Sequence, residues 1–184
     1  MGISELAAAI AEPATLKLNE RANRLREQGE PVIHLGSGEP QSKAPADAIR
    51  AASAKLESGD IKYTPTSGVM PLKKAVASYT RQNYGVEVDS ANVLVSAGAK
   101  PALAATLTSL VEPGDEVVFP APYWVSYPEM VKMVRGVPVV VTAADGGFEP
   151  GLDEMLEALT DRTKACILNS PNNPSGAVYS ESFI

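Results

Sequence analysis

Short apolar runs alternate with longer amphipathic segments along the second half of this chain. The short runs predict strands at 93–95, 117–119, 137–141 and 165–168. The segments between them predict helices at 99–110, 125–134 and 151–159. Strands that helices cover on both sides are apolar throughout, and strands that alternate with helices form parallel sheets. The pattern therefore predicts an α/β fold with a mostly parallel sheet and helices on both faces.

The first half of the chain is dominated by helical spacing. Amphipathic patterns predict helices at 15–28, 45–57 and 71–84, each followed by a glycine-containing stop. A short apolar run predicts one strand at 32–35. The final residues, 179–184, resemble the N-cap and first turn of a helix. We therefore expect the chain to be a fragment of a longer protein.

Composition excludes several classes of function. The 184 residues are 45% hydrophobic, which is enough for one substantial domain. The net charge is −6 without a basic run, so we expect neither nucleic acid nor a membrane surface as partner. The first residues lack the basic region of a secretory signal, so we expect no such leader, and no apolar run has membrane-spanning length. With one cysteine, Cys166, and one histidine, His34, we expect a cytoplasmic protein without disulfides or metal.

Two proline-rich loops follow apolar runs and are candidates for a binding site. The first is Pro120-Ala121-Pro122-Tyr123-Trp124, and the second is Asn169-Ser170-Pro171-Asn172-Asn173-Pro174-Ser175-Gly176. Open α/β sheets bind their ligands in the crevice outside the carboxyl ends of the strands. The second loop offers side-chain amides and backbone N–H groups to an anion. These loops are therefore the first place to expect ligand contacts.

A third segment places a small-residue turn between a predicted strand and a helix. It reads Val93-Leu94-Val95-Ser96-Ala97-Gly98-Ala99-Lys100-Pro101. A helix N-terminus presents unpaired N–H groups and positive dipole charge, which suit a phosphate. Lys100 is electrostatically unfavourable at that positive end, which favours a functional role for it over a solvated one. Taken alone, such a turn is more often plain structure than a phosphate site.

Together these segments resemble the pyridoxal-phosphate aminotransferases of classes I and II, and among them the bacterial aspartate/prephenate aminotransferases. The resemblance runs from about Pro13 to Tyr179. It implies that residues 45–184 are an incomplete large, cofactor-binding domain of the aspartate aminotransferase fold. Residues 1–44 would be an N-terminal arm with part of the small domain. The implied reaction moves an amino group between an acidic amino acid, such as aspartate, and a 2-oxo acid through pyridoxal 5′-phosphate.

The resemblance also assigns the cofactor contacts. Gly98, Ala99 and Lys100 fall on the turn that holds the cofactor phosphate. Trp124 matches the aromatic residue that stacks on the pyridine ring and borders the substrate. Asn173 matches the asparagine that contacts the ring oxygen and the substrate carboxylate. It further implies cis peptide bonds at Ala121–Pro122 and Asn173–Pro174. Gly98, Trp124 and Asn173 are expected to meet at one edge of the sheet.

Substrate binding and assembly follow from the same resemblance. Gly38 matches the glycine whose N–H contacts the substrate α-carboxylate. Lys100 and Thr15 match residues that recognise an acidic substrate. Tyr63 matches a tyrosine that reaches the cofactor phosphate of the neighbouring subunit, which implies a homodimer with shared active sites.

No catalytic residue is assigned within this chain, because none of its lysines matches the family's Schiff-base lysine. We therefore expect residues 1–184 alone to be inactive. Two alternatives remain open. One is another pyridoxal-phosphate enzyme of the same fold, such as a lyase or decarboxylase. The other is a non-catalytic fragment that acts only as a structural or dimerisation partner.

Overall fold

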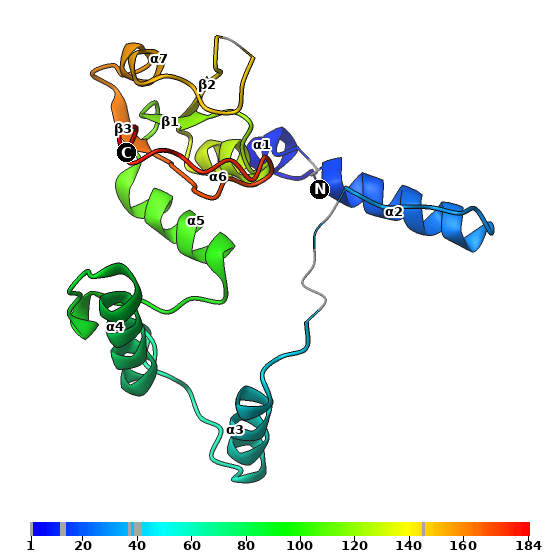
Figure 1. Ribbon diagram of the computed structural model, residues 1–184, viewed down its shortest axis with the longest axis vertical. Coiled ribbons are helices and arrows are strands. Elements are labelled where there is room, and N and C mark those ends of the chain that lie inside the picture. The colour runs from blue at the N-terminus through cyan, green and yellow to red at the C-terminus, as the bar shows by residue number, and fades with distance from the viewer. Residues whose placement is uncertain (1, 12–13, 37, 39–41, 145) are drawn as a thin grey trace. The chain divides into compact units, whose positions relative to one another are not determined.

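The computed structural model describes residues 2–11, 14–36, 38, 42–144 and 146–184. These residues divide into two compact units (Figure 1). Unit 1 comprises Met1–Ser37 and Leu103–Ile184, and unit 2 comprises Gly38–Ala102. These units are groups of residues that contact one another, and they do not test the domain boundaries expected from the family resemblance. The expected domains 1–44 and 45–184 therefore stay a prediction.

A parallel three-stranded sheet is the centre of unit 1. The strands are β1 (Glu116–Pro120), β2 (Val137–Val141) and β3 (Thr163–Cys166), in the order β2-β1-β3. Both pairs are parallel, as expected. Every residue of the central strand is buried, which explains why its sequence is apolar almost without interruption.

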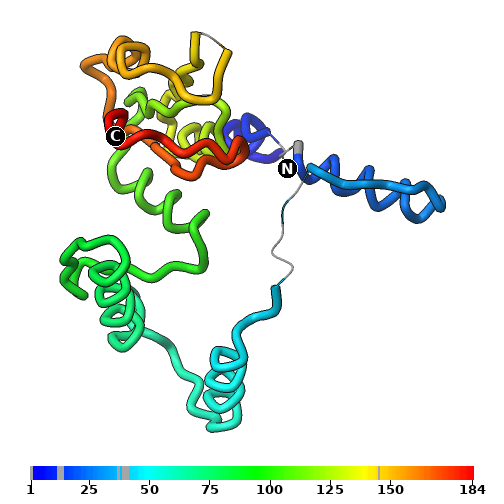
Figure 2. The backbone as a smooth tube through the Cα atoms, viewed as in Figure 1, coloured from blue at the N-terminus to red at the C-terminus, as the bar shows by residue number. Residues whose placement is uncertain are grey.

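Helices cover both faces of this sheet, as the sequence pattern predicts. Alternate side chains of β1 point to opposite faces. Val117 and Phe119 pack with residues of α5 (Ala99–Leu110) and α6 (Ser126–Met133). Val118 packs with Met155 of α7 (Leu152–Glu157) on the other face. In Figure 2, the green, yellow and orange parts of the tube are the backbone of these strands and helices.

A buried carboxylate joins β1 to the segment that leads into β3. The Arg162 guanidinium donates to Glu116 Oε1 at 2.5 Å, and the Thr160 hydroxyl donates to Glu116 Oε2 at 2.6 Å. The Glu116 backbone N–H donates to the Arg162 carbonyl at 2.8 Å. The pairing of β1 with β3 shifts register between Glu116 and Val117. These bonds therefore hold the amino-terminal ends of β1 and β3 together at the position where the register of their pairing shifts.

The N-terminal helices of unit 1 are α1 (Glu5–Ala9) and α2 (Ala14–Glu27). Ser4 caps α1 by accepting from the Ala7 N–H. After α1, the Ala11 N–H donates to Glu129 Oε2 of α6 at 3.0 Å. This bond attaches the N-terminal segment to the helix that follows β1.

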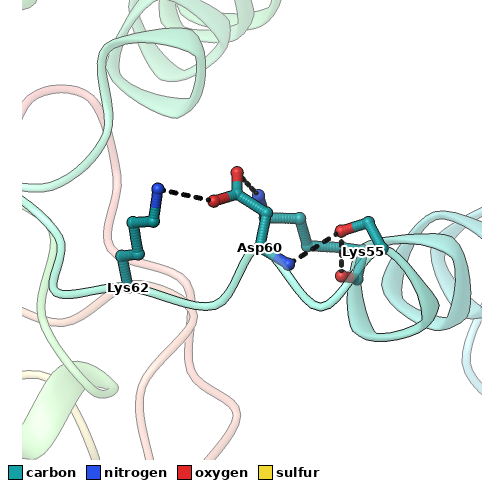
Figure 3. Close-up of polar contacts among 4 residues, drawn as sticks. Lys55, Asp60 and Lys62 are labelled. Atoms are coloured by element: carbon teal, nitrogen blue, oxygen red, sulfur yellow. Dashed lines mark hydrogen bonds and ion pairs between the residues drawn. The ribbon is translucent and has the colours of Figure 1, made fainter.

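Unit 2 contains α3 (Ala46–Glu57), α4 (Met70–Tyr84) and the short 3₁₀ helix η1 (Ser90–Asn92). Buried Lys73 of α4 donates from Nζ to Ser67 Oγ at 3.1 Å. Beyond the end of α3, Asp60 accepts from Lys55 at 2.9 Å and pairs with Lys62 at 3.2 Å (Figure 3). All three of these charged side chains are exposed.

Two expected strands are wrong. Residues 32–35 and 93–95 form no strand, because an apolar run becomes a strand only where a neighbour completes its hydrogen-bond ladder. Ile33 and Leu35 are 87% and 90% exposed. The N–H of Val95 instead donates to the Ser67 carbonyl in a loop. Residues 181–183 form a turn in which the Ser180 carbonyl accepts from the Phe183 and Ile184 N–H groups, which agrees with the expected first turn of a helix.

Candidate functional site

The chain that leaves the central strand forms the first loop of the candidate site. The peptide bond Ala121–Pro122 is cis, as expected. The Ala121 N–H donates to the Val141 carbonyl at 2.7 Å and so extends the β1–β2 pairing into the loop. Tyr123 and Trp124 therefore begin directly at the carboxyl end of β1, and α6 follows them.

Aromatic rings pack around the end of β1 and set the orientation of Trp124. The rings of Trp124 and Tyr127 meet edge to face, with centroids 5.6 Å apart at 88°. Phe119 makes similar contacts with Tyr123 and Tyr127, with centroids at 4.9 Å and 5.8 Å. Trp124 is only partly buried in this cluster. Packing thus fixes one edge of the indole and leaves part of it accessible to a flat ligand.

The chain that leaves β3 forms the second loop. Its Ser170–Pro171 and Asn173–Pro174 bonds are cis, the second as expected and the first not foreseen. The Asn172 side-chain amide donates to the Pro122 carbonyl at 2.7 Å and to Ser175 Oγ at 2.8 Å. A direct hydrogen bond therefore joins the loops after β1 and β3. Asn173, the next residue, is exposed.

The expected phosphate turn belongs to unit 2. Gly98 has a φ of 103°, in the left-handed region that favours glycine, and a Cβ there would meet nothing within 4 Å. Ala99 and Lys100 are the first residues of α5 and are exposed. A helix start leaves its first N–H groups without intrahelical partners, so this end suits an anion. That Gly98 lies beside Trp124 and Asn173 stays a prediction.

The remaining expected contacts lie in different surroundings. Thr15 is half-buried near the start of α2 in unit 1. Gly38 is exposed, and a Cβ at that position would meet nothing within 4 Å. Ser37, Glu39 and Pro40 of the same motif lie outside the described residues. Tyr63 is 106% exposed in a loop of unit 2. Their assigned roles stay predictions.

Burial changes the titration of several groups near these loops. It raises the pKa of the Tyr127 phenol beside Trp124. Burial, the charge of Glu149 and the proximity of Tyr127 raise the pKa of Tyr179. The Tyr179 hydroxyl is buried without a hydrogen-bond partner among the described residues. Both phenols therefore stay neutral over the physiological pH range.

Metal and thiol chemistry find no support in the part of the chain that the structure describes. No group of three or more His, Cys, Asp or Glu residues there could hold a metal ion. Burial raises the pKa of the Cys166 thiol, which makes it a weaker nucleophile. None of the described helices is both long enough and apolar enough to cross a bilayer.

Sequence reasoning missed Asn172, the residue that connects the two loops. Asn172 and Asn173 are consecutive amides in a proline-rich loop, and the family resemblance assigns a role only to Asn173. The sequence does not distinguish a buried amide from an exposed one. A pair of adjacent asparagines after a strand is the signal that could have suggested one structural and one functional residue.

A family model described as "Aminotransferase class I and II" matches residues 30–184. The chain is 41% identical over 184 residues to a probable aspartate/prephenate aminotransferase of Thermus aquaticus, covering 100% of this chain and 48% of that protein. It is 40% identical over 180 residues to an aspartate aminotransferase of Geobacillus stearothermophilus, covering 97% and 46%. The chain thus spans about half the length of these curated relatives.

Solved structures show the same similarity. The Thermus thermophilus aspartate aminotransferase with maleate superimposes with a TM-score of 0.94 at 40% identity, over 100% of this chain and 48% of that one. The aspartate aminotransferase of Rhizobium meliloti gives a TM-score of 0.92 at 36% identity, over 99% and 46%. The fold of this chain therefore matches about half of the aspartate aminotransferase chain.

Proposed function

Because the chain belongs to the class I and II aminotransferases, we propose that the protein it comes from transfers amino groups between an acidic amino acid and a 2-oxo acid. Enzymes of this family depend on pyridoxal 5′-phosphate. The chain covers less than half of its relatives' length, so the proposed activity is that of the whole protein. Aspartate is the proposed amino-acid substrate.

One observation in the structure carries this proposal: the loops after β1 and β3 are hydrogen-bonded to each other through Asn172. The two strands are adjacent and parallel, so their carboxyl ends lie at the same edge of the sheet. The chain turns to opposite sides of β1 to form β2 and β3, which makes this edge a switch point in the topology. Such points are where open α/β sheets bind ligands.

The residues present fit the chemical groups of pyridoxal phosphate. The partly accessible indole of Trp124 offers a π face to an electron-poor ring. The exposed amide of Asn173 can donate to a ring oxygen without adding charge. The start of α5 suits a phosphate, and glycine at position 98 leaves room for it. When bound, the cofactor supplies an electron-withdrawing ring that carries the amino group between the two acids.

Substrate selection is assigned to Lys100, with Thr15 and Gly38 as further contacts. A lysine at the positive end of a helix is stabilised when a carboxylate lies against it, because the anion offsets both positive contributions. We also assign Tyr63 to the neighbouring subunit of a homodimer. Its complete exposure leaves the phenol accessible to a second chain.

The test of this function is the substrate dependence of Lys100→Ala in the full-length protein. Loss of one charge-assisted contact lowers kcat/KM for aspartate by roughly tenfold or more, at about 1.4 kcal/mol per decade. Activity with alanine should change little. Lys62→Ala is the matched control, because Lys62 is an exposed lysine paired with Asp60.

Two results would contradict the assignment. Equal losses for aspartate and alanine would move Lys100 from the substrate to the cofactor phosphate. A full-length protein without transamination of any amino acid would overturn the proposed reaction itself. Binding of pyridoxal phosphate without transamination would instead favour another enzyme class on the same fold.

A further inference from the structure

Asn172 is a buried polar residue inside a loop where its sequence neighbour is exposed. Its residue exposure is 7%, and both hydrogens of its side-chain amide are donated, to the Pro122 carbonyl and to Ser175 Oγ. A buried amide that makes its hydrogen bonds contributes to the rigidity of its surroundings, whereas an unpaired one is costly. The NH2 group of the Asn172 side chain is thus committed to structure and is not available to a ligand.

The backbone of Asn172 is also held at both of its polar groups. Its N–H donates to the Ala177 carbonyl at 2.8 Å, and its carbonyl accepts from the Gly176 N–H at 2.8 Å. Ser175 Oγ in turn accepts from the Ala177 N–H at 3.2 Å. The loop from Asn172 to Ala177 is therefore closed on itself, and the Asn172 amide connects that closed loop to the end of β1.

This connection lies between the residues to which the proposed function assigns the cofactor ring. Asn173 is the next residue after Asn172, and Trp124 lies two residues after Pro122. A site that must hold a ring between an indole and an amide requires a fixed separation of the two. The bond from Asn172 to Pro122 is the direct side-chain link that can fix it.

We propose that Asn172 is a positioning residue, which sets the placement of Asn173 relative to Trp124 and so the orientation of the cofactor ring. This inference rests on the proposed function. The chemistry requires an amide, because a carboxylate of the same shape cannot donate to a carbonyl. In Asn172→Asp, two acceptors would face each other across 2.7 Å, and the loops would separate.

The test uses the full-length protein loaded with pyridoxal phosphate, with Asn172→Asp, Asn172→Ala and Ser175→Ala as variants. Circular dichroism in the cofactor's visible absorption band reports how rigidly an achiral ring is held in a chiral site. We expect Asn172→Asp to lose at least half of this signal per bound cofactor and to raise the cofactor Kd about tenfold. Ser175→Ala keeps the bond from Asn172 to Pro122. It should therefore lower the visible signal and raise the cofactor Kd by smaller amounts than Asn172→Asp does.

The matched control is Asn83→Asp. Asn83 donates from its side-chain amide to the Tyr79 carbonyl at 2.9 Å, on the exposed surface of α4. The control therefore removes the same type of hydrogen bond within a helix of unit 2, and its visible signal and Kd should equal those of the wild type. Thermal unfolding of every variant separates a loss of folding from a loss of ring placement.

An unchanged visible signal per bound cofactor in Asn172→Asp would overturn the inference, even if the variant unfolds at a lower temperature. If Asn172→Asp does not fold, Ser175→Ala decides by the same criterion. A wild-type protein that binds no pyridoxal phosphate would overturn the proposed function, and the inference with it. Normal wild-type binding with unaffected variants would overturn the inference alone.

Discussion

The two ends of the β1–β3 strand pair are both closed by buried polar side chains, but with opposite chemistry. At the amino-terminal end, the Glu116 carboxylate binds Arg162 and Thr160. At the carboxyl end, the neutral amide of Asn172 binds Pro122 and Ser175. The charged connection holds an irregular strand register, and the neutral one holds two loops.

The difference indicates that the contact at the amino-terminal end of the strand pair serves mainly stability, and the contact at the carboxyl end serves mainly ligand binding. A buried charge requires a charged partner and satisfied hydrogen bonds, which Glu116 finds in Arg162 and Thr160. Near a site for an anionic cofactor, a fixed carboxylate would repel the ligand. An amide connects the loops there without adding charge. We therefore expect removal of a charge to lower the free energy of unfolding most at the amino-terminal end. At the carboxyl end, we expect substitutions to change mainly how a ligand is placed.

The largest effect on stability is expected for Arg162→Ala. The side chain of Glu116 is 6% exposed, whereas that of Arg162 is 69% exposed. Removing the arginine leaves a buried carboxylate with only the Thr160 hydroxyl and should cost about 2–3 kcal/mol in free energy of unfolding. Urea denaturation measures this. Arg50→Ala breaks a fully exposed Arg–Asp pair and should cost less than about 0.5 kcal/mol.

If Arg162→Ala and Arg50→Ala lower the free energy of unfolding equally, the buried Glu116 carboxylate does not need Arg162 more than an exposed carboxylate needs its arginine. Glu116→Gln refines the comparison. It keeps an acceptor for Thr160 and removes the charge, so it should cost about 1 kcal/mol, less than the loss of the arginine.

A smaller effect of opposite sign is expected for Tyr179→Phe near the carboxyl end. The Tyr179 N–H donates to Ser170 Oγ of the loop after β3, but its buried hydroxyl has no partner among the described residues. Removing an unsatisfied hydroxyl while keeping the ring should raise the free energy of unfolding by about 1 kcal/mol. Tyr84→Phe, on an exposed ring, should be neutral. Destabilisation by Tyr179→Phe would show that the hydroxyl has a partner in solution.

A pH-dependent effect is expected at Glu129 of α6. Its hydrogen bonds to Lys132 and to the Ala11 N–H hold its pKa below the ordinary value of 4.5. A lowered pKa in the folded state means that the stabilisation is present above pH 4.5 and is lost as the pH falls through the folded value. Glu129→Gln should therefore cost about 0.5 kcal/mol at pH 7, and this cost should decrease as the pH falls below 4.5. A cost that is independent of pH would contradict this origin.

The smallest effect is expected at Asp60 in unit 2 (Figure 3). Lys55 and then Lys62 lower its pKa, so any contribution to stability is present above the ordinary value of 3.8 and lost below it. The group is fully exposed, and water and salt screen both pairs. Asp60→Asn should not change the urea midpoint measurably. A clear shift that disappears in high salt would show that exposed pairs matter here too.

The sequence was sufficient where a pattern has one physical solution. The short apolar run Val117 to Phe119 lies between turn residues and is a buried strand as predicted, and the helix predicted at 99–110 has the observed bounds. It was insufficient at 32–35 and 93–95, because a strand depends on a partner elsewhere in the chain. Ile33, Leu35 and Leu94 of these runs are exposed in loops.

The same limit applies to the candidate site. Motif residues such as Trp124 and Asn173 could be named from their loops, since turn chemistry and strand ends are visible in sequence. The role of Asn172 could not, because it depends on a hydrogen bond to Pro122, fifty positions away. Long-range polar contacts of this kind have no local signature, whereas hydrophobic periodicity does.

A crystal structure of the full-length protein with pyridoxal phosphate would show directly whether the two loops hold the cofactor ring. We expect the pyridine ring stacked on the Trp124 indole, with the Asn173 side-chain amide within hydrogen-bond distance of a ring oxygen. The bond from Asn172 to Pro122 should be retained beneath them. A ring bound away from Trp124, or an Asn173 side chain directed away from it, would contradict the account.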